Sequence, residues 1–311
     1  MKTGIYLSYV GLGANLMHLS YCHQIAKKNG PVTIITLCKN LEAALIDDPL
    51  IDKVFYIDQY HKKLIDIFNL ANVLKKFDLK NLLIFYPSIR LYLSAKLAGI
   101  KNIRIYNSFK KKNLHLVKAA KKLTEDFLRI NNCPTETHFF VNKDKSNKIK
   151  QEYKNKFKIV IGAGSSGPTN RWGAKNFSKL INQLNKSDDY FFFLLCGPNE
   201  RQIENEIISN LDKENFTTLS DKNIENLIPY LCASDMYVGN DSFGSHITSQ
   251  SGKKSIVMLL DAPRAYTDYS KNYHRMIPKG FNIDEITHGT NADPNLITVE
   301  EVIKTINQFR N

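Results

Sequence analysis

Short apolar runs alternate with amphipathic stretches along nearly the whole chain. Each apolar run is strand-sized and rich in β-branched or aromatic residues, as expected of a strand that is buried on both faces. In the first half these runs cover residues 5–9, 32–38, 54–57, 82–86 and 103–106. Stretches with helical periodicity separate them, at residues 15–28, 40–46, 61–77 and 89–98. The alternation predicts βαβ units and a parallel sheet.

The pattern restarts after a polar stretch rich in lysine and asparagine, residues 142–156, which we interpret as a partly helical interdomain linker. Strands are then expected at residues 157–161, 190–196, 217–219, 236–238 and 255–260. Helices are expected at residues 176–184, 200–211, 224–232, 245–251 and 299–309.

The sequence thus predicts an α/β protein with two Rossmann-like, doubly wound parallel-sheet domains, residues 1–145 and 157–295. A C-terminal helical segment, residues 296–311, is expected to pack back towards the N-terminal domain. Two such domains leave a cleft between them, and ligands of doubly wound sheets bind at the carboxyl ends of the strands. The cleft is therefore the expected active site.

The composition is that of a globular protein, with 43% hydrophobic and 23% charged residues among 311. No apolar run is long enough for a membrane helix, and the N-terminus lacks the features of a signal peptide, so we expect a cytoplasmic location. The five cysteines show neither paired nor metal-ligand spacing, which favours free thiols in a reducing compartment and no bound metal.

A formal net charge of +13 has three interpretations. One is nucleic-acid binding, which we do not expect because no recognised nucleic-acid motif accompanies the charge. Another is peripheral association with an anionic surface, such as phosphorylated glycolipid or the inner face of the cytoplasmic membrane. The third is biased composition, since only eight of the 43 basic residues are arginine. A lysine cluster at positions 110–112, 118, 121 and 122 is either a contact for an anionic acceptor or a solvated helix face.

Candidate chemistry begins where the strand at 157–161 runs into a loop of glycines and hydroxyl side chains. Backbone amides of such a loop can approach an anion closely, and Ser165 and Ser166 can donate hydrogen bonds to phosphate oxygens. Arg171 can add a charge-assisted contact. The P-loop pattern is absent, and a plain strand-to-helix turn is the alternative interpretation.

A second strand-to-helix turn follows the strand at 236–238 and reads Gly-Asn-Asp-Ser-Phe-Gly-Ser-His over residues 239–246. The N-terminus of a helix binds phosphate through its free amides and its dipole. Asp241 and Ser242 also suit helix capping, and His246 also suits a packed core position. The functional alternative is that His246 donates to the phosphate of a leaving nucleotide.

Three motifs in order resemble glycosyltransferase family 9, the family of the ADP-heptose:lipopolysaccharide heptosyltransferases. They are Gly-x-Gly-Ser-Ser with Trp172 (162–172), Leu-Cys-Gly-Pro-Asn-Glu (195–200), and the segment 233–247. The resemblance implies a GT-B fold with two domains facing across a cleft. It also implies inverting, metal-independent transfer of a heptose or related sugar. The implied donor is a nucleotide sugar, ADP-linked, with no separate cofactor, and the implied acceptor is a saccharide or lipopolysaccharide core.

The resemblance also assigns residues. Contacts to the donor phosphates fall on Ser165, Ser166, Arg171, Asp241, Ser242, Gly244 and His246, and the acidic residue near the donor ribose falls on Glu200. Glu200 also suits the first turn of a helix, where the dipole stabilises a carboxylate. The chain departs from the family pattern at two positions. Phe243 occupies the position of a glycine in the family, and Asn170 occupies the position of a lysine.

The N-terminal turn departs more seriously from the family pattern. In members of the family, an aspartate after the first strand is the proposed general base. At that position this chain has Ala14, within a turn that contains Gly11, Gly13 and Asn15. Three explanations stay open: another base such as His18, different donor or acceptor chemistry, or an inactive chain. His18 also suits a packed helix position. The alternative function is therefore a catalytically impaired nucleotide-sugar-binding protein.

Overall fold

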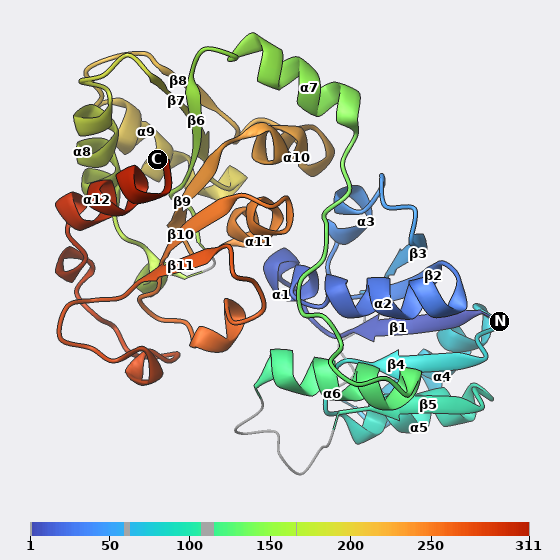
Figure 1. Cartoon of the computed structure of the whole chain (residues 1–311). Helices are drawn as coiled ribbons and strands as arrows, with labels where there is room; N and C mark the ends of the chain where they lie inside the picture. The colour runs from blue at the N-terminus through green and yellow to red at the C-terminus, as the bar shows by residue number, and fades with distance from the viewer. Residues whose placement is uncertain (1, 59–62, 107–114, 166, 311) are drawn as a thin grey trace. The chain divides into compact units, whose positions relative to one another are not determined.

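The computed structural model describes residues 2–58, 63–106, 115–165 and 167–310. The chain divides between Phe140 and Val141 into two compact units (Figure 1).

The first unit is built on a five-stranded parallel sheet with the strand order β3-β2-β1-β4-β5. The strands are β1 (Thr3–Leu7), β2 (Val32–Thr36), β3 (Ile51–Tyr56), β4 (Asn81–Ile84) and β5 (Asn102–Ile105). The helices are α1 (Leu12–Leu16), α2 (Leu19–Asn29), α3 (Leu41–Ala44), α4 (Ile65–Lys75), α5 (Ile89–Leu97) and α6 (Leu116–Leu128). All five expected strands are present, within a few residues of the expected bounds.

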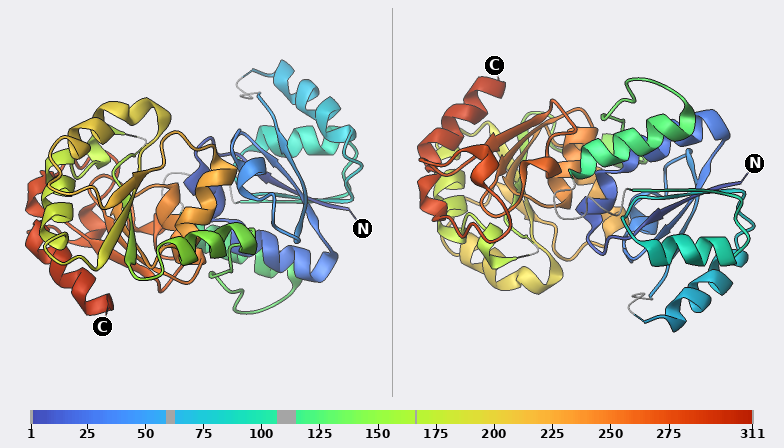
Figure 2. Two further views of the ribbon diagram at one scale, coloured as in Figure 1. Left: turned by 90° about the horizontal axis from the view of Figure 1, so that it is seen from above. Right: turned by 90° about the horizontal axis from the view of Figure 1, so that it is seen from below.

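Helices cover both faces of this sheet. Helix α2 packs with α6, and α4 packs with α5. Figure 2 shows the two pairs on opposite faces of the sheet. The central strands β1 and β2 are buried along their whole length, which explains their continuous apolar runs.

The structure corrects two details of the first unit. The helix expected at 15–28 begins earlier and is interrupted at His18, whose main chain separates α1 from α2. Helix α6 was not predicted from the apolar pattern, and a helix was considered there only as one interpretation of the lysine cluster. Its apolar positions Val117, Ala120 and Leu123 are all buried. The segment after α6 is tied back to α2, because the Ser20 hydroxyl donates to the carbonyls of Pro134 and Glu136.

The second unit contains a six-stranded parallel sheet with the order β11-β10-β9-β6-β7-β8. The strands are β6 (Phe157–Gly162), β7 (Tyr190–Leu195), β8 (Phe216–Thr218), β9 (Met236–Asn240), β10 (Lys254–Met258) and β11 (Tyr273–Met276). The helices are α7 (Lys143–Glu152), α8 (Ala174–Leu184), α9 (Arg201–Ile208), α10 (Ile224–Ala233), α11 (Phe243–Gln250) and α12 (Val299–Arg310). Short 3₁₀ turns lie at Pro168–Asn170, Pro198–Glu200, Arg264–Tyr266, Ile283–Glu285 and Pro294–Leu296.

Helices α8, α9 and α12 lie on one face of this sheet, and α7, α10 and α11 lie on the other (Figures 1 and 2). The fully buried Trp172 lies in the main core cluster, its ring edge-on to Phe177 and its indole nitrogen donating to the carbonyl of Ile297 at 2.9 Å. The core thus reaches from the loop before α8 to the segment before α12.

Two expected boundaries change with this packing. The apolar face of helix α12 belongs to the second unit, because Val299, Val302 and Ile306 are buried in its core, against α8 and β10. The stretch interpreted as a linker is mostly helix α7, which packs on α10 and belongs to the second unit. Within the parts of the chain that the structure describes, none of the helices combines the length and apolar character needed to cross a bilayer.

Candidate functional site

The predicted donor residues gather at one edge of the second sheet. Strands β9, β6 and β7 are neighbours in that order, and each is followed by a loop that carries a predicted motif. Because parallel strands present their carboxyl ends at the same edge, the three loops lie side by side.

Glu200 is the centre of the contacts between the β6 and β7 loops. Its carboxylate accepts from the backbone amides of Ser165 (2.9 Å) and Gly197 (2.7 Å) and from the Arg171 guanidinium (2.9 Å). The fit is close: a Cβ added at Gly164 would lie 2.0 Å from a Glu200 oxygen. A carboxylate has about four acceptor positions, so three contacts leave room for one more. Glu200 therefore holds the loops together, and a ribose contact would be additional to that role.

The loop after β6, where phosphate contacts were predicted, is only partly available for ligand contacts. The Ser165 hydroxyl donates to the carbonyl of Gly167 at 2.7 Å, and Arg171 donates to the carbonyl of Ser165 at 3.2 Å. Ser166 lies outside the described residues. Arg171 is 30% exposed and its buried Nε has no partner among the described residues. The arginine is thus anchored through Glu200 while part of it stays accessible.

Asn240, at the end of β9, ties the loops together from the other side. Its amide oxygen accepts from the backbone nitrogen of Trp172 (2.8 Å), and its amide nitrogen donates to the carbonyl of Ala163 (2.7 Å). The side chain is fully buried. Sequence reasoning missed this residue because an asparagine beside Asp241 suggests a turn, and its partners are about 70 positions away.

The ring of Tyr237 fills the space between β6 and α11. A Cβ added at Gly162 would lie 1.9 Å from the Tyr237 hydroxyl, and one added at Gly244 would lie 3.0 Å from the ring and 2.4 Å from Leu195. The hydroxyl donates to the carbonyl of Asn240 at 2.7 Å and lies 3.0 Å from the Ser242 hydroxyl. Gly244 is therefore required by packing, and Ser242 is engaged with Tyr237 instead of capping α11.

The β9–α11 turn brings together a buried carboxylate, a buried histidine and two tyrosines. Nδ1 of His246 lies 2.6 Å from the Tyr269 hydroxyl and 3.0 Å from the Tyr273 hydroxyl, and the Tyr269 ring stacks on the imidazole. Nε2 of His246 faces Oδ1 of Asp241 at 3.8 Å, which is longer than a hydrogen bond. With two hydroxyl donors at Nδ1 and a carboxylate beyond Nε2, the consistent tautomer carries its proton on Nε2.

Burial dominates the electrostatics of this turn. The side chains of Asp241 and His246 are only 8% and 4% exposed. Burial raises the pKa of Asp241 from 3.8 to about 6 and lowers the pKa of His246 to about 3, so the imidazole is neutral at pH 7. Asp241 Oδ1 has no hydrogen-bond partner within the described ranges. Such a group is costly to leave unpaired, and its place beside an uncapped helix N-terminus suits a polar ligand.

The N-terminal turn has a different arrangement. Asn15 is buried and donates to the carbonyls of Tyr9 (2.9 Å) and Gly11 (2.7 Å), while its oxygen accepts from Thr36 (2.8 Å). His18 is 1% exposed; its Nδ1 donates to the carbonyl of Ala14 at 2.8 Å, and its Nε2 accepts from the Tyr106 hydroxyl at 3.0 Å.

Burial lowers the pKa of His18 to about 4, against the smaller opposing effect of its bond to Ala14. The structure thus places His18 inside the first unit, with both ring nitrogens occupied by the chain's own groups. Gly11 is exposed and Ala14 is half-buried, so this turn presents main chain to its surroundings, not a titratable side chain.

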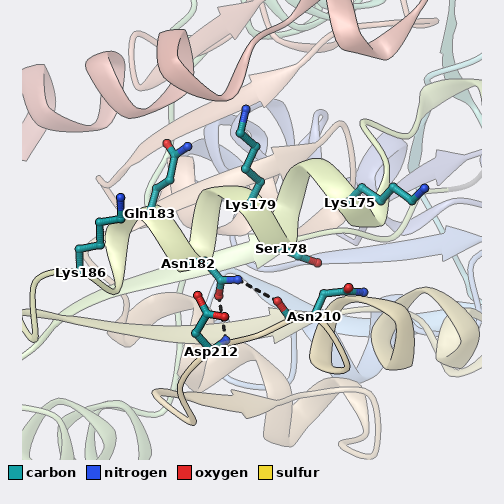
Figure 3. A pocket seen from close by; sticks show the side chains of 8 residues that line it. All are labelled: Lys175, Ser178, Lys179, Asn182, Gln183, Lys186, Asn210 and Asp212. Atoms are coloured by element: carbon teal, nitrogen blue, oxygen red, sulfur yellow. Dashed lines mark hydrogen bonds between the residues drawn. The ribbon is translucent and has the colours of Figure 1, made fainter.

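A surface hollow of about 380 Å³ lies away from these loops, on the outer side of α8. Figure 3 shows its three lysines, of which Lys175 and Lys179 extend from α8 and Lys186 from the chain just after it. Asn182 donates to the carbonyl of Asn210 and accepts from the amide of Asp212, so these polar groups are paired with one another. None of the predicted donor residues lines this hollow.

Comparisons with known proteins concern the family and the fold of this chain. The model of glycosyltransferase family 9 (heptosyltransferase) matches residues 95–273. The chain is 24% identical, over 162 residues, to lipopolysaccharide heptosyltransferase 1 of Campylobacter coli. That match covers 50% of this chain and 47% of the relative, about half the length of each protein.

Three solved structures resemble the whole chain. Escherichia coli ADP-heptose lipopolysaccharide heptosyltransferase II has a TM-score of 0.77 at 15% identity, with 99% of this chain and 98% of that chain covered. A Veillonella parvula family 9 glycosyltransferase has a TM-score of 0.78 at 15% identity (99% and 96% covered), and Escherichia coli heptosyltransferase WaaC with ADP has 0.73 at 13% identity (99% of each). These likenesses show the fold and confirm the expected GT-B architecture of two parallel-sheet domains.

Proposed function

Because the chain belongs to glycosyltransferase family 9, we propose that it transfers a heptose or a related sugar from a nucleotide-sugar donor to a saccharide or lipopolysaccharide-core acceptor. The donor is ADP-linked, and the transfer proceeds with inversion and without a metal ion. The enzyme works in the cytoplasm, in peripheral contact with the inner face of the membrane. Neither a further cofactor nor nucleic acid takes part.

The observation that carries this proposal is the β9–α11 turn. Its helix N-terminus has no side-chain cap, and Nε2–H of His246 stands 3.8 Å from Asp241, too far for a hydrogen bond. The unpartnered oxygen of Asp241 is an acceptor, so it suits a hydroxyl group of the ligand and not a phosphate oxygen. A diphosphate at this turn accepts from the helix amides and from Nε2–H, while Arg171 supplies a cation from the neighbouring loop. These groups stabilise the negative charge that develops on the leaving nucleotide.

The reaction exchanges one bond to the anomeric carbon for another and removes one proton from the acceptor. An acceptor hydroxyl attacks the anomeric carbon, the bond from that carbon to the phosphate oxygen breaks, and the nucleoside diphosphate leaves. The hydroxyl proton passes to a base, and the position where the family has its aspartate is Ala14. Since His18 offers no unoccupied nitrogen, the base in this chain is supplied by another group, by the acceptor or by water.

The second candidate function, nucleotide-sugar binding without turnover, is favoured by this same position. A methyl group at Ala14 cannot accept a proton, and the closed hydrogen bonding of His18 gives no substitute. An alanine at position 14 and a fully hydrogen-bonded His18 are what we expect of a family member that binds the donor without transferring its sugar.

One experiment separates the two functions. Binding of ADP, GDP and UDP is measured by thermal shift, and release of ADP from ADP-heptose with a lipopolysaccharide-core acceptor is measured for the native chain and for Ala14→Asp. If the chain transfers sugar, we expect ADP to raise the melting temperature and the native chain to release ADP. If the chain only binds the donor, we expect ADP to raise the melting temperature and only Ala14→Asp to show turnover. If none of the three nucleotides shifts the melting temperature, the donor site is wrong.

A further inference from the structure

Exposed apolar side chains are distributed unevenly in this protein. Among the described residues, nine large hydrophobic side chains are exposed, and all nine belong to the first unit. Six of them lie on α4, on the residue before it, or on α5. We call these six the α4/α5 apolar surface: Leu64 (75% exposed), Ile65 (59%), Phe68 (57%), Ile89 (62%), Leu93 (43%) and Leu97 (49%).

These side chains form continuous faces on helices that pack together. On α5, Ile89, Leu93 and Leu97 are spaced four residues apart and therefore share one side of the helix. The opposite side of α5, with Leu91 and Ala95, is buried. Helices α4 and α5 contact each other on the sheet face away from α2 and α6, as Figure 2 shows. Both helices thus present apolar side chains on an outer surface.

The charge around this surface is strongly positive. Residues 63–101 contain seven lysines and arginines against two aspartates, Asp66 and Asp78. Lys75 and Lys76 at the end of α4, Lys96 on α5 and Lys101 after it are all exposed. On the α5 helical wheel, Arg90 and Lys96 flank the apolar side. Long basic side chains around an apolar centre can reach a charged interface while their stems stay among apolar groups.

This combination selects one kind of partner. A nucleic acid is bound by cations and aromatic platforms, and an aliphatic centre gives it nothing to recognise. An amphipathic surface with aliphatic and Phe side chains in the centre and lysines at the border fits the boundary between acyl chains and anionic headgroups. Apolar patches of this kind on a protein surface mark interaction sites.

We propose that the α4/α5 apolar surface docks the first unit on an anionic lipid bilayer. The apolar side chains enter the headgroup boundary, and the lysines of α4 and α5 contact acidic headgroups. The inference rests on the proposed function in one respect: an acceptor held in a membrane gives the docking its purpose. Bilayer binding itself needs neither donor nor transfer, so it can be tested separately.

The test is flotation of the full chain with vesicles of phosphatidylethanolamine and phosphatidylglycerol, and with vesicles of phosphatidylcholine alone. We expect binding to the anionic vesicles that falls as salt increases. The variant Phe68→Ser/Leu93→Ser loses at least about tenfold in partition coefficient, because two apolar side chains no longer leave water. Ile46→Ser is the matched control, since Ile46 is 61% exposed in the same unit but lies outside this surface.

A second pair of variants tests the charge. Lys75→Gln/Lys76→Gln is expected to weaken binding to anionic vesicles by about five- to tenfold. Lys175→Gln/Lys186→Gln removes the same charge from exposed positions on α8 and just after its end, and is expected to change binding less than twofold. All variants are expected to keep the circular dichroism spectrum and the ADP-induced thermal shift of the native chain.

Three outcomes overturn the proposal. The first is that the native chain does not bind anionic vesicles, and the second is that the α4/α5 variants and their controls lose vesicle binding equally. The third is that the chain associates with itself without lipid and Phe68→Ser abolishes this association, which would assign the surface to a second copy of the chain. A missing ADP shift with intact vesicle binding instead counts against the donor site alone.

Discussion

The β1–α1 turn of the first unit and the β9–α11 turn of the second have the same layout. In each, a buried parallel strand runs into a short turn, and a histidine follows a few residues into the helical region. In the first turn, both nitrogens of His18 are bonded to groups of the chain. In the second, only Nδ1 of His246 is bonded, and Nε2 faces an aspartate oxygen that has no hydrogen-bond partner within the described ranges.

The difference separates a structural turn from one suited to a ligand. Buried polar groups are nearly always hydrogen-bonded, so a closed network such as that of His18 and Asn15 is explained by the fold alone. An open network is costly, and it persists where something outside the chain completes it. The position of a histidine after a strand does not reveal which of the two it is; its partners do.

The largest effect is expected from His18→Ala. The change leaves the buried Tyr106 hydroxyl without its partner and opens a cavity, which costs about 3 kcal/mol of unfolding free energy. The first unit should unfold at a lower urea concentration when followed by circular dichroism. The only tryptophan, Trp172, lies in the second unit, so the transition seen by its fluorescence should not move. Equal shifts of both signals would contradict the structural role of His18.

The next effect is the pH dependence of Asp241→Asn. A pKa of about 6 in the folded protein, against 3.8 as the ordinary value, corresponds to about 3 kcal/mol of instability above pH 6. The folded state binds this proton more tightly than the unfolded state, so the cost disappears as pH falls from 6 towards 4. Asp241→Asn should therefore be more stable than the native chain at pH 7.5 by about 2–3 kcal/mol and equally stable near pH 4.

Trp172 fluorescence in urea measures that difference. Protonation of His246 opposes stability in the same pH range, but it contributes to both proteins and largely cancels in the comparison. If the difference in unfolding free energy between the two proteins stays constant from pH 4 to 7.5, burial of the Asp241 carboxylate does not destabilise the folded protein.

A smaller effect is expected for ADP affinity in His246→Gln. The loss of one ring N–H donor to a phosphate weakens binding by roughly tenfold. His18→Gln is the matched control, with less than a twofold change, and isothermal titration calorimetry gives both values. If the two variants lose affinity equally, the distinction between the turns is lost.

The smallest effect is expected from Tyr269→Phe. At 2.6 and 3.0 Å, both tyrosine hydroxyls reach Nδ1 of His246, so Tyr273 can donate in place of Tyr269. ADP affinity should fall about twofold, and removal of both hydroxyls should approach the loss seen in His246→Gln. A full loss in Tyr269→Phe alone would show that Tyr273 does not substitute.

The sequence predicted the sheets well because their signal is local. All five strands of the first sheet and five of the six in the second coincide with apolar runs, whereas the edge strand β11 (Tyr-His-Arg-Met) has no such run and was missed. Helix α7 was interpreted as linker because its helical face contains only Ser146 and Ile149 as buried positions. Little burial leaves little periodicity to detect.

The site was predictable as a set of positions but not as a network. Motif order placed Asp241 and His246 in one turn and assigned Glu200 to the ribose of the same donor. The contacts that define their roles join residues distant in sequence, such as Asn240 with Trp172 and Glu200 with Arg171. Whether a carboxylate faces a ligand or holds two loops depends on such contacts, which a single sequence does not encode locally.

The Tyr237 ring, fitted between Gly162 and Gly244, also constrains how this protein can evolve. An alanine at Gly162 would collide with the ring unless position 237 became smaller in the same lineage. A smaller residue there would release the Asn240 carbonyl and the Ser242 hydroxyl that Tyr237 now engages. Positions 162, 237 and 244 should therefore covary among homologues, and their joint replacement would mark branches whose β9–α11 turn has been rebuilt.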